Sequence, residues 1–188
     1  SSYPSGTVGR KTGIISRDAW NNEVVLQTLL IQPGVSISVS SKSYDAATRT
    51  LSATVTVTAL TDLSGSYYIN YVLTENNLIY TQTGNSSCAG ASNYIHDHVV
   101  KSMLNGDLGE MINSGNWTTG QQITRNINYV LPETPQVANP DNCDINIFVY
   151  KQGTGISTNS NVQQAMRTPV TTTTGIVNNN SNALTYNL

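Results

Sequence analysis

The residues best suited to chemistry in this sequence are two histidines, His96 and His98, which flank Asp97. Imidazole nitrogens are common metal ligands, and residues two apart share a face only where the chain is extended. A metal would need further ligands from elsewhere, and the sequence contains no other histidine. The pair is therefore a weak metal-site candidate. The alternative is a histidine that hydrogen-bonds the backbone at a corner of the fold.

Other catalytic patterns are missing from the sequence. Serine is abundant, but no Gly-x-Ser-x-Gly nucleophile turn occurs. The 11 acidic residues are scattered singly, mostly in expected turns, rather than in the pairs that glycoside hydrolysis needs. Gly153 and Gly155 fit a hairpin-like turn better than a phosphate-binding loop. We therefore predict a non-enzymatic protein with no catalytic residue, resident metal or cofactor.

The two cysteines, Cys88 and Cys143, each lie in a polar stretch and far apart in the chain. They lack the paired spacing and the number of ligands of a zinc site. In an oxidising compartment a disulfide between them is expected, and it would stabilise the fold by roughly 4 kcal/mol through loop closure. The alternative is two unpaired thiols.

Attachment sites for glycans are suggested by short sequence patterns. Asn-x-Ser/Thr occurs at Asn85, Asn116 and Asn179, all expected in turns or in the tail, although so much Asn, Ser and Thr also produces such patterns by chance. A run of threonines is a comparable candidate for O-linked sugar. Its members are Thr171, Thr172, Thr173 and Thr174.

Composition narrows the class of protein. Charged residues make up 11% of the chain, against roughly 25% in typical soluble proteins. Thr, Asn and Ser number 24, 22 and 20 of the 188 residues. With 9 basic residues and a net charge of −2, no basic patch could neutralise nucleic-acid phosphates. No stretch approaches the ~20 apolar residues of a membrane-spanning helix. Because the chain starts at Ser1, we expect either a cleaved signal or a fragment of a precursor.

Hydrophobic periodicity predicts one helix followed by strands. Ser16 and Asp18 fit a helix start, and Pro33-Gly34 fits its end, which gives a short helix at about 17–30 within segment 16–33. Residues 34–170 then alternate apolar and small polar side chains in seven or eight short strands. This pattern predicts a mostly β fold, an antiparallel immunoglobulin-like β-sandwich with a short N-terminal helix and extended terminal arms.

The two ends of the chain lie outside this sandwich in the predicted organisation. Residues 1–15 form an N-terminal arm, and residues 171–188 form a Thr/Asn-rich tail that ends in an alternating strand. Such a terminal strand either pairs with the sheet edge of another subunit or folds back on its own sandwich. The candidate subunit-interface residues are Tyr3, Pro4, Val8, Ile14, Leu184, Tyr186 and Leu188.

Four stretches resemble, in the same order, the Omp twenty-eight-type family of outer-membrane-associated proteins of Gram-negative bacteria. They are YPSGTVGR at 3–10, YYINYVLTENNLIYTQTG at 67–84, YIHDHVVKSMLNGDLGE at 94–110 and INIFVYKQ at 145–152. The resemblance covers most of residues 3–168. It implies a protein with a thioredoxin-like domain followed by an immunoglobulin-like sandwich. This chain corresponds to the C-terminal, sandwich part of such a protein.

Within that resemblance, Pro4 falls where a thioredoxin-like domain has its cis-proline, and the helix falls on that domain's last helix. No Cys-x-x-Cys motif is present, so no oxidoreductase activity is implied. Residues 1–15 are then an orphan strand with unpaired backbone groups, which donation to a neighbouring subunit would satisfy. The overall make-up also resembles, more weakly, subunits of glycan-coated extracellular fibrils.

These observations predict a secreted or cell-surface structural subunit that polymerises head to tail with copies of itself by strand exchange and carries covalent glycans. The alternative is a cell-surface module that binds carbohydrate or protein. Tyr67, Tyr68, Tyr71 and Tyr80 could stack on sugars if exposed, or else pack in the core.

Overall fold

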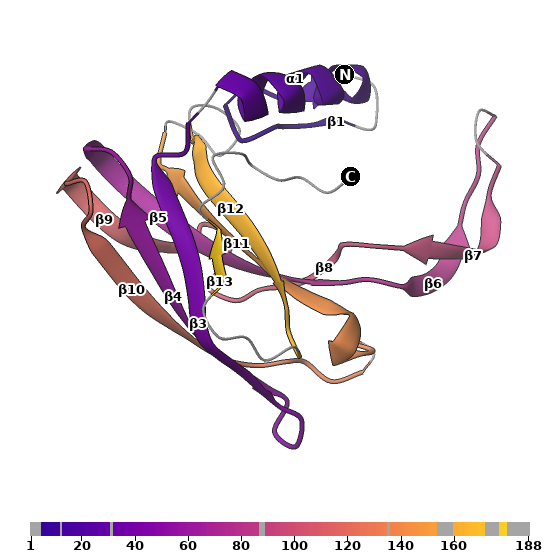
Figure 1. Cartoon of the computed structure of the whole chain (residues 1–188). Helices are drawn as coiled ribbons and strands as arrows, with labels where there is room; N and C mark the ends of the chain where they lie inside the picture. The colour runs from indigo at the N-terminus through magenta and orange to yellow at the C-terminus, as the bar shows by residue number, and fades with distance from the viewer. Residues whose placement is uncertain are drawn as a thin grey trace.

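The computed structural model describes residues 5–11, 13–30, 32–86, 89–134, 136–153, 160–171 and 177–179. Two antiparallel sheets form the body of the molecule (Figure 1). One sheet has the order β10-β4-β3-β13, and the other has the order β12-β11-β5-β8, with β9 also paired to β5. The predicted mostly β, antiparallel fold with one short helix is confirmed, and the arrangement is compatible with an immunoglobulin-like sandwich.

The elements follow one another from the N-terminus to the C-terminus of the described chain. They are β1 (Ser5–Gly6), β2 (Ile15–Ser16), α1 (Arg17–Leu30), β3 (Val35–Asp45), β4 (Thr50–Ala59), β5 (Leu63–Glu75), β6 (Leu78–Gln82), β7 (Ala91–His96), β8 (Val99–Met103), β9 (Glu110–Trp117), β10 (Gln122–Val130), the 3₁₀ turn η1 (Pro140–Asn142), β11 (Cys143–Lys151), β12 (Val162–Pro169) and β13 (Val177–Asn179).

The core lies between the two sheets, because alternate residues of their strands face each other. In β3, Val35, Ile37 and Val39 are at most 1% exposed, while the intervening serines are half-buried. In β11, Ile145, Ile147 and Val149 belong to the same core cluster. The alternation that predicted these strands therefore also predicted correctly which side chains enter the core.

Alternation leaves two aromatic side chains of β11, Phe148 and Tyr150, on the face opposite the core. Tyr150 is nevertheless only 4% exposed. Elements β1, β2 and α1 lie together at one end of the sandwich, next to the ends of the strands (Figure 1), and the guanidinium of Arg10, from the turn between β1 and β2, lies over the rings of Phe148 and Tyr150. The helix predicted at about 17–30 is α1, and it begins and ends at those residues.

The arm predicted as an orphan strand is paired within its own chain, and this corrects the prediction. Ser5 and Gly6 of β1 pair with Ser16 and Ile15 of β2. Further along, the amide of Val162 donates to the carbonyl of Gly9 at 2.9 Å. The arm reaches partners in its own chain because the turn before α1 reverses its direction, so its described part needs no neighbouring subunit.

A separate hairpin, β6–β7, extends away from the sandwich (Figure 1). Ile79 pairs with Ile95 and Tyr80 pairs with Tyr94, and all four side chains are exposed. The stretch from 91 to 117 carries β7, β8 and β9. Pairing of β8 and β9 with the long strand β5 gives it regular structure.

Candidate functional site

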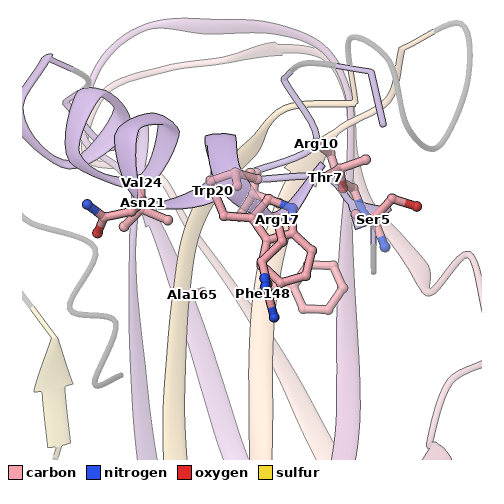
Figure 2. Close-up of a pocket in the computed structure, with 13 residues that line it drawn as sticks. Ser5, Thr7, Arg10, Arg17, Trp20, Asn21, Val24, Phe148 and Ala165 are labelled. Carbon is pink, nitrogen blue, oxygen red and sulfur yellow. The ribbon is translucent and has the colours of Figure 1, made fainter. Parts of the chain in front are cut away.

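A cleft of about 760 Å³ lies between the N-terminal segment, α1 and the outer face of β11 and β12. Its apolar wall consists of Trp20 and Val24 from α1 and of Phe148, Val162 and Ala165 from the sheet. Arg10 and Arg17 supply the charges of the lining. Figure 2 shows the side chains of Arg17 and Trp20 gathered beside Phe148. This volume is in the range of small-molecule sites in proteins.

The turn at Gly9 and Arg10 brings the arm onto the helix. Both residues have left-handed backbone conformations, with φ of 58° and 54°. A Cβ atom at Gly9 would lie 2.1 Å from Oε1 of Gln27, so a side chain there would displace that amide and strain the backbone. Nε2 of the buried Gln27 donates to the carbonyl of Val8 and to Oε1 of Glu23, both at 2.8 Å. This network fixes the position of Arg10 at the edge of the cleft.

Trp20 holds the other side of the arm. Its ring lies 3.4 Å from the place where a Cβ atom at Gly6 would be, so the absence of a side chain at Gly6 allows close contact. The indole Nε1 donates to the carbonyl of Ile15 at 3.3 Å. The indole is thus oriented by the two short strands of the arm, β1 and β2, and its apolar surface remains part of the cleft wall.

The guanidinium of Arg10 lies over two aromatic rings. Its Cζ atom is 4.9 Å from the centre of the Phe148 ring and 4.8 Å from that of Tyr150, which is a cation–π arrangement. The hydroxyl of Tyr150 donates to the carbonyl of Leu108 at 2.6 Å. Burial raises the pKa of Tyr150, and the adjacent Arg10 charge partly offsets that increase.

One nitrogen of Arg10 is buried without a partner. No group in the described part of the chain accepts a hydrogen bond from Nη1, and the ion pairs found there do not include Arg10. A buried donor of a charged group costs free energy until it is paired. Nη1 itself is covered by protein atoms, but the half-buried Arg10 side chain lines the cleft and places a positive charge there.

The cleft offers binding groups rather than a catalytic set. Its hydroxyl-bearing side chains are Ser5 and Thr7, and the described residues that line it include no histidine, cysteine or carboxylate that could act as a base. Across the described residues, no group of three or more metal-ligating side chains is found.

The two histidines predicted as weak metal ligands occupy a corner of the hairpin. His96 ends β7 and packs against Tyr94, with ring centres 4.8 Å apart. His98 lies beyond the strand with φ of 56°, so the extended geometry that would put both on one face is lost. The amide of His98 donates to Oδ1 of Asn76, and Asp97 accepts from the amide of Asn77, both at 2.9 Å.

The predicted disulfide is not supported by the structure. Cys143 begins β11 with its side chain 1% exposed, and its thiol is free. Its Sγ atom donates to the carbonyl of Asn139 at 3.4 Å. The polar residues before Cys143 form the 3₁₀ turn η1, and the chain enters the core at Cys143 itself. Cys88 lies outside the described residues.

The glycosylation candidates fall in different surroundings. Asn85 and Asn116 are exposed, but Asn116 lies in β9 rather than in the predicted turn, because β9 pairs with β5 there. Asn179 belongs to β13, and Thr171 is half-buried just after β12. Thr172, Thr173 and Thr174 lie outside the described residues. All seven positions stay predictions.

The candidate subunit-interface residues also fall in different surroundings, and some lie outside the described residues. Val8 is buried under its own helix, at 8% exposure, while Ile14 is 64% exposed. Short strand β13 pairs with β3 of its own chain, at the edge of the first sheet. Five further candidates lie outside the described residues, namely Tyr3, Pro4, Leu184, Tyr186 and Leu188.

Of the four tyrosines considered for sugar stacking, Tyr67 and Tyr71 are core residues, at 2% and 4% exposure. Tyr68 stacks on Tyr150 with ring centres 5.5 Å apart. Tyr80 is 57% exposed on the projecting hairpin. They do not form a common surface.

Sequence reasoning missed the cleft because its parts come from distant segments. A signal was nevertheless present: in the stretch INIFVYK, alternation puts the aromatic residues Phe148 and Tyr150 opposite the core positions Ile147 and Val149. Large aromatic side chains on an outer face indicate a covering layer.

The family model described as "Outer membrane protein Omp28" matches residues 1–171. Among solved structures, the chain is similar to HBP35 of Porphyromonas gingivalis, with a TM-score of 0.67 and 17% sequence identity. The alignment covers 90% of this chain and 53% of that one, so this chain spans about half the length of its structural neighbour. No curated protein matches the sequence.

None of the described helices has the length and apolar character required to cross a membrane. The predicted location at the surface of a Gram-negative bacterium is confirmed by the family match, which extends over nearly all of the chain. The resemblance seen in the four sequence stretches is confirmed as well, and the chain belongs to the Omp28 family of outer membrane proteins.

Proposed function

We propose that this chain is a non-enzymatic, ligand-binding module of a bacterial surface protein, with the cleft under α1 as its binding site. One observation carries the proposal: Arg10, whose guanidinium lies over two aromatic rings, lines a cleft of about 760 Å³ with an apolar wall. Ligand sites combine apolar walls with a few fixed polar groups in this way. This is the binding-module alternative, with the ligand in a cleft rather than on exposed tyrosines.

The arrangement of the arm also supports a binding role. Arg10 is held in a left-handed conformation that costs a side-chain-bearing residue free energy, and such strain concentrates at functional positions. The surrounding contacts of Gln27, Trp20 and Val162 hold the arm in place without filling the cleft.

A neutral fluorescent probe tests this function. N-phenyl-1-naphthylamine, which brightens in apolar surroundings, is titrated into the wild-type protein and into Ala165→Phe, which adds a ring to the cleft wall. We expect saturable binding to the wild type and at least tenfold weaker binding to Ala165→Phe. The control is Leu29→Ala, at a position that is 71% exposed on α1. Equal binding by all three proteins would contradict the proposal.

A second candidate function is the fibre subunit assembled by strand exchange. It is favoured by β13, which lies at the edge of the first sheet and, among the described residues, pairs with β3 at three positions, Val177, Asn178 and Asn179. A strand at the edge of a sheet can be supplied by another copy of the chain. Exposed Asn85 and Asn116 would let attached glycans extend from such a fibre into solvent.

Electron microscopy of the native protein tests this second candidate. Filaments that disappear when residues 177–188 are deleted, but persist in the control Leu29→Ala, would support exchange of the tail. Intact mass on the same sample detects glycans as an excess over 20.2 kDa. Monodisperse particles with and without the tail would rule out the fibre.

A further inference from the structure

The charges of the cleft have one sign. Arg10 and Arg17 line it, and no acidic side chain does so among the described residues, although the whole chain carries a net charge of −2. The net negative charge of the chain does not account for a cleft whose charged side chains are both arginines. It indicates a ligand with an anionic group.

The geometry of Arg10 favours direct binding of one anionic group of the ligand by the guanidinium. Its guanidinium is oriented by the rings of Phe148 and Tyr150, and the half-buried side chain lines the cleft. A guanidinium binds a carboxylate or phosphate through paired hydrogen bonds, and such bonds are stronger when they are shielded from water.

The rest of the wall favours an apolar body. The side chains of Trp20, Val24 and Ala165 offer no acceptor to a sugar, and the polar side chains besides the arginines are few: Ser5, Thr7 and Asn21. A carbohydrate would leave many hydroxyl groups unpaired against this wall. An aliphatic or aromatic chain would instead gain stability from burial.

We propose, building on the binding function above, that the ligand is an amphipathic anion: an aliphatic or aromatic body packed on Trp20 and Phe148, with one carboxylate or phosphate bound by Arg10. Arg17 adds electrostatic attraction at the exposed side of the cleft. The same chemistry is found in free fatty-acid-like anions and in anionic lipids.

Competition against the neutral probe tests the charge preference. Decanoate, decyl phosphate and decanol have the same chain length and differ in the head group. We expect decanoate and decyl phosphate to displace the probe from wild-type protein at concentrations at least tenfold lower than decanol. Added salt should reduce that difference, because part of the attraction is between charges.

Substitutions test the role of Arg10 directly. Arg10→Met keeps the length of the side chain without the charge, and it should bring the preference for decanoate over decanol close to one. Arg10→Lys keeps the charge without the fork of donors, so it should retain part of the preference. Arg125→Met, which removes a cation that pairs with Glu110, is the matched control and should leave the preference unchanged.

The outcomes separate this proposal from the function on which it rests. If the probe binds in the cleft but decanol competes as well as decanoate with the wild type, the anionic ligand is ruled out and the binding function remains. If the probe does not bind, both fail. The wild-type comparison decides the matter even if Arg10→Met does not fold. Competition by phosphatidylglycerol vesicles would identify a lipid head group as the source, and its absence a free anion.

Discussion

Glu75 and Arg10 are both charged residues with buried polar atoms. The buried atoms of Glu75 have hydrogen-bonding partners, and Nη1 of Arg10 has none among the described residues. Glu75, at the end of β5, is 0% exposed and fully paired: Oε2 lies 3.3 Å from Nζ of Lys101, and Oε1 accepts from the amide of Asn139 at 2.6 Å. Arg10, under α1, has a buried Nη1 that no described group accepts from. The sandwich thus pairs its buried carboxylate internally, whereas the layer of β1, β2, α1 and the turn between them (the arm layer) leaves Nη1 of Arg10 without an acceptor in the described chain.

The two regions also differ in backbone strain and in packing. The carboxylate of Glu75 joins regular strands to the segment before η1, where the amide of Ala138 donates to it at 3.2 Å. Arg10 follows a glycine in a turn with two successive left-handed residues. We therefore expect stability to depend chiefly on the first region and the proposed binding on the second, so changes at the two charges should have different consequences.

The largest expected effect comes from breaking the pairing of Glu75. Glu75→Ala leaves Lys101, whose side chain is 13% exposed, and two backbone amides without an acceptor. Loss of one partner from a buried pair costs about 3–5 kcal/mol. We expect a decrease of that size in the free energy of unfolding, measured in urea by circular dichroism.

Two matched variants complete this experiment. Glu110→Ala removes a carboxylate that is 44% exposed and paired with Arg125, which should cost at most about 1 kcal/mol. Arg10→Met should be similarly mild or even stabilising, because it removes a buried unpaired donor. A loss at Arg10→Met as large as that at Glu75→Ala would remove the distinction between the two regions.

A smaller effect is expected from Gly9→Ala, which perturbs the arm layer alone. The new Cβ atom would lie 2.1 Å from Oε1 of Gln27 at a φ of 58°, so both a clash and backbone strain oppose the native turn. We expect a cost of about 1–3 kcal/mol and weaker probe binding, because Arg10 moves with the turn.

Gly120→Ala separates strain from clash in this test. Gly120 has φ of 83°, and nothing lies within 4 Å of a Cβ atom there. It should therefore cost about 1 kcal/mol from strain and leave probe binding unchanged. If Gly9→Ala binds the probe as the wild type does, the turn does not position the cleft.

The sandwich was predictable from sequence because its signals are local. Val35, Ile37 and Val39 alternate with serines, and this period of two both identifies a strand and assigns its faces. Strand β9 carries no such local signal, since Asn113, Gly115 and their small polar neighbours have low strand propensity. Its register with β5 comes from contacts distant in sequence, which override that propensity.

The cleft was not predictable, because no local pattern brings Arg10 to Phe148. Their contact depends on how the arm reverses before α1 and packs on the outer face of β11. The prediction of an orphan arm failed for the same reason: unpaired strand groups can be satisfied within the chain as well as by a neighbour. For the same reason, the sequence did not predict that Val8 would be buried within its own chain.

The smallest expected effect is the pH dependence of stability caused by Cys143, which lies near Glu75. Burial, then the nearby Glu75 and Asp144 charges, raises the pKa of Cys143 from its ordinary value of 9.0 to about 12. Between these two values the unfolded chain has lost the thiol proton and the folded chain still holds it, so stability falls as pH rises. This group alone should lower the free energy of unfolding by about 1 kcal/mol between pH 9 and pH 10.

The measurement is the difference in unfolding free energy between the wild type and Cys143→Ala at these two pH values, because the other titrating groups largely cancel in that difference. We expect the wild type to lose about 1 kcal/mol more than the variant. Equal losses would mean that the thiol titrates alike in both states. In a Glu75→Gln background the excess loss should decrease above pH 10, since one of the charges that raise the pKa of Cys143 is gone. That dependence would show the carboxylate of Glu75 acting as a charge inside the fold, as its pairing with Lys101 requires.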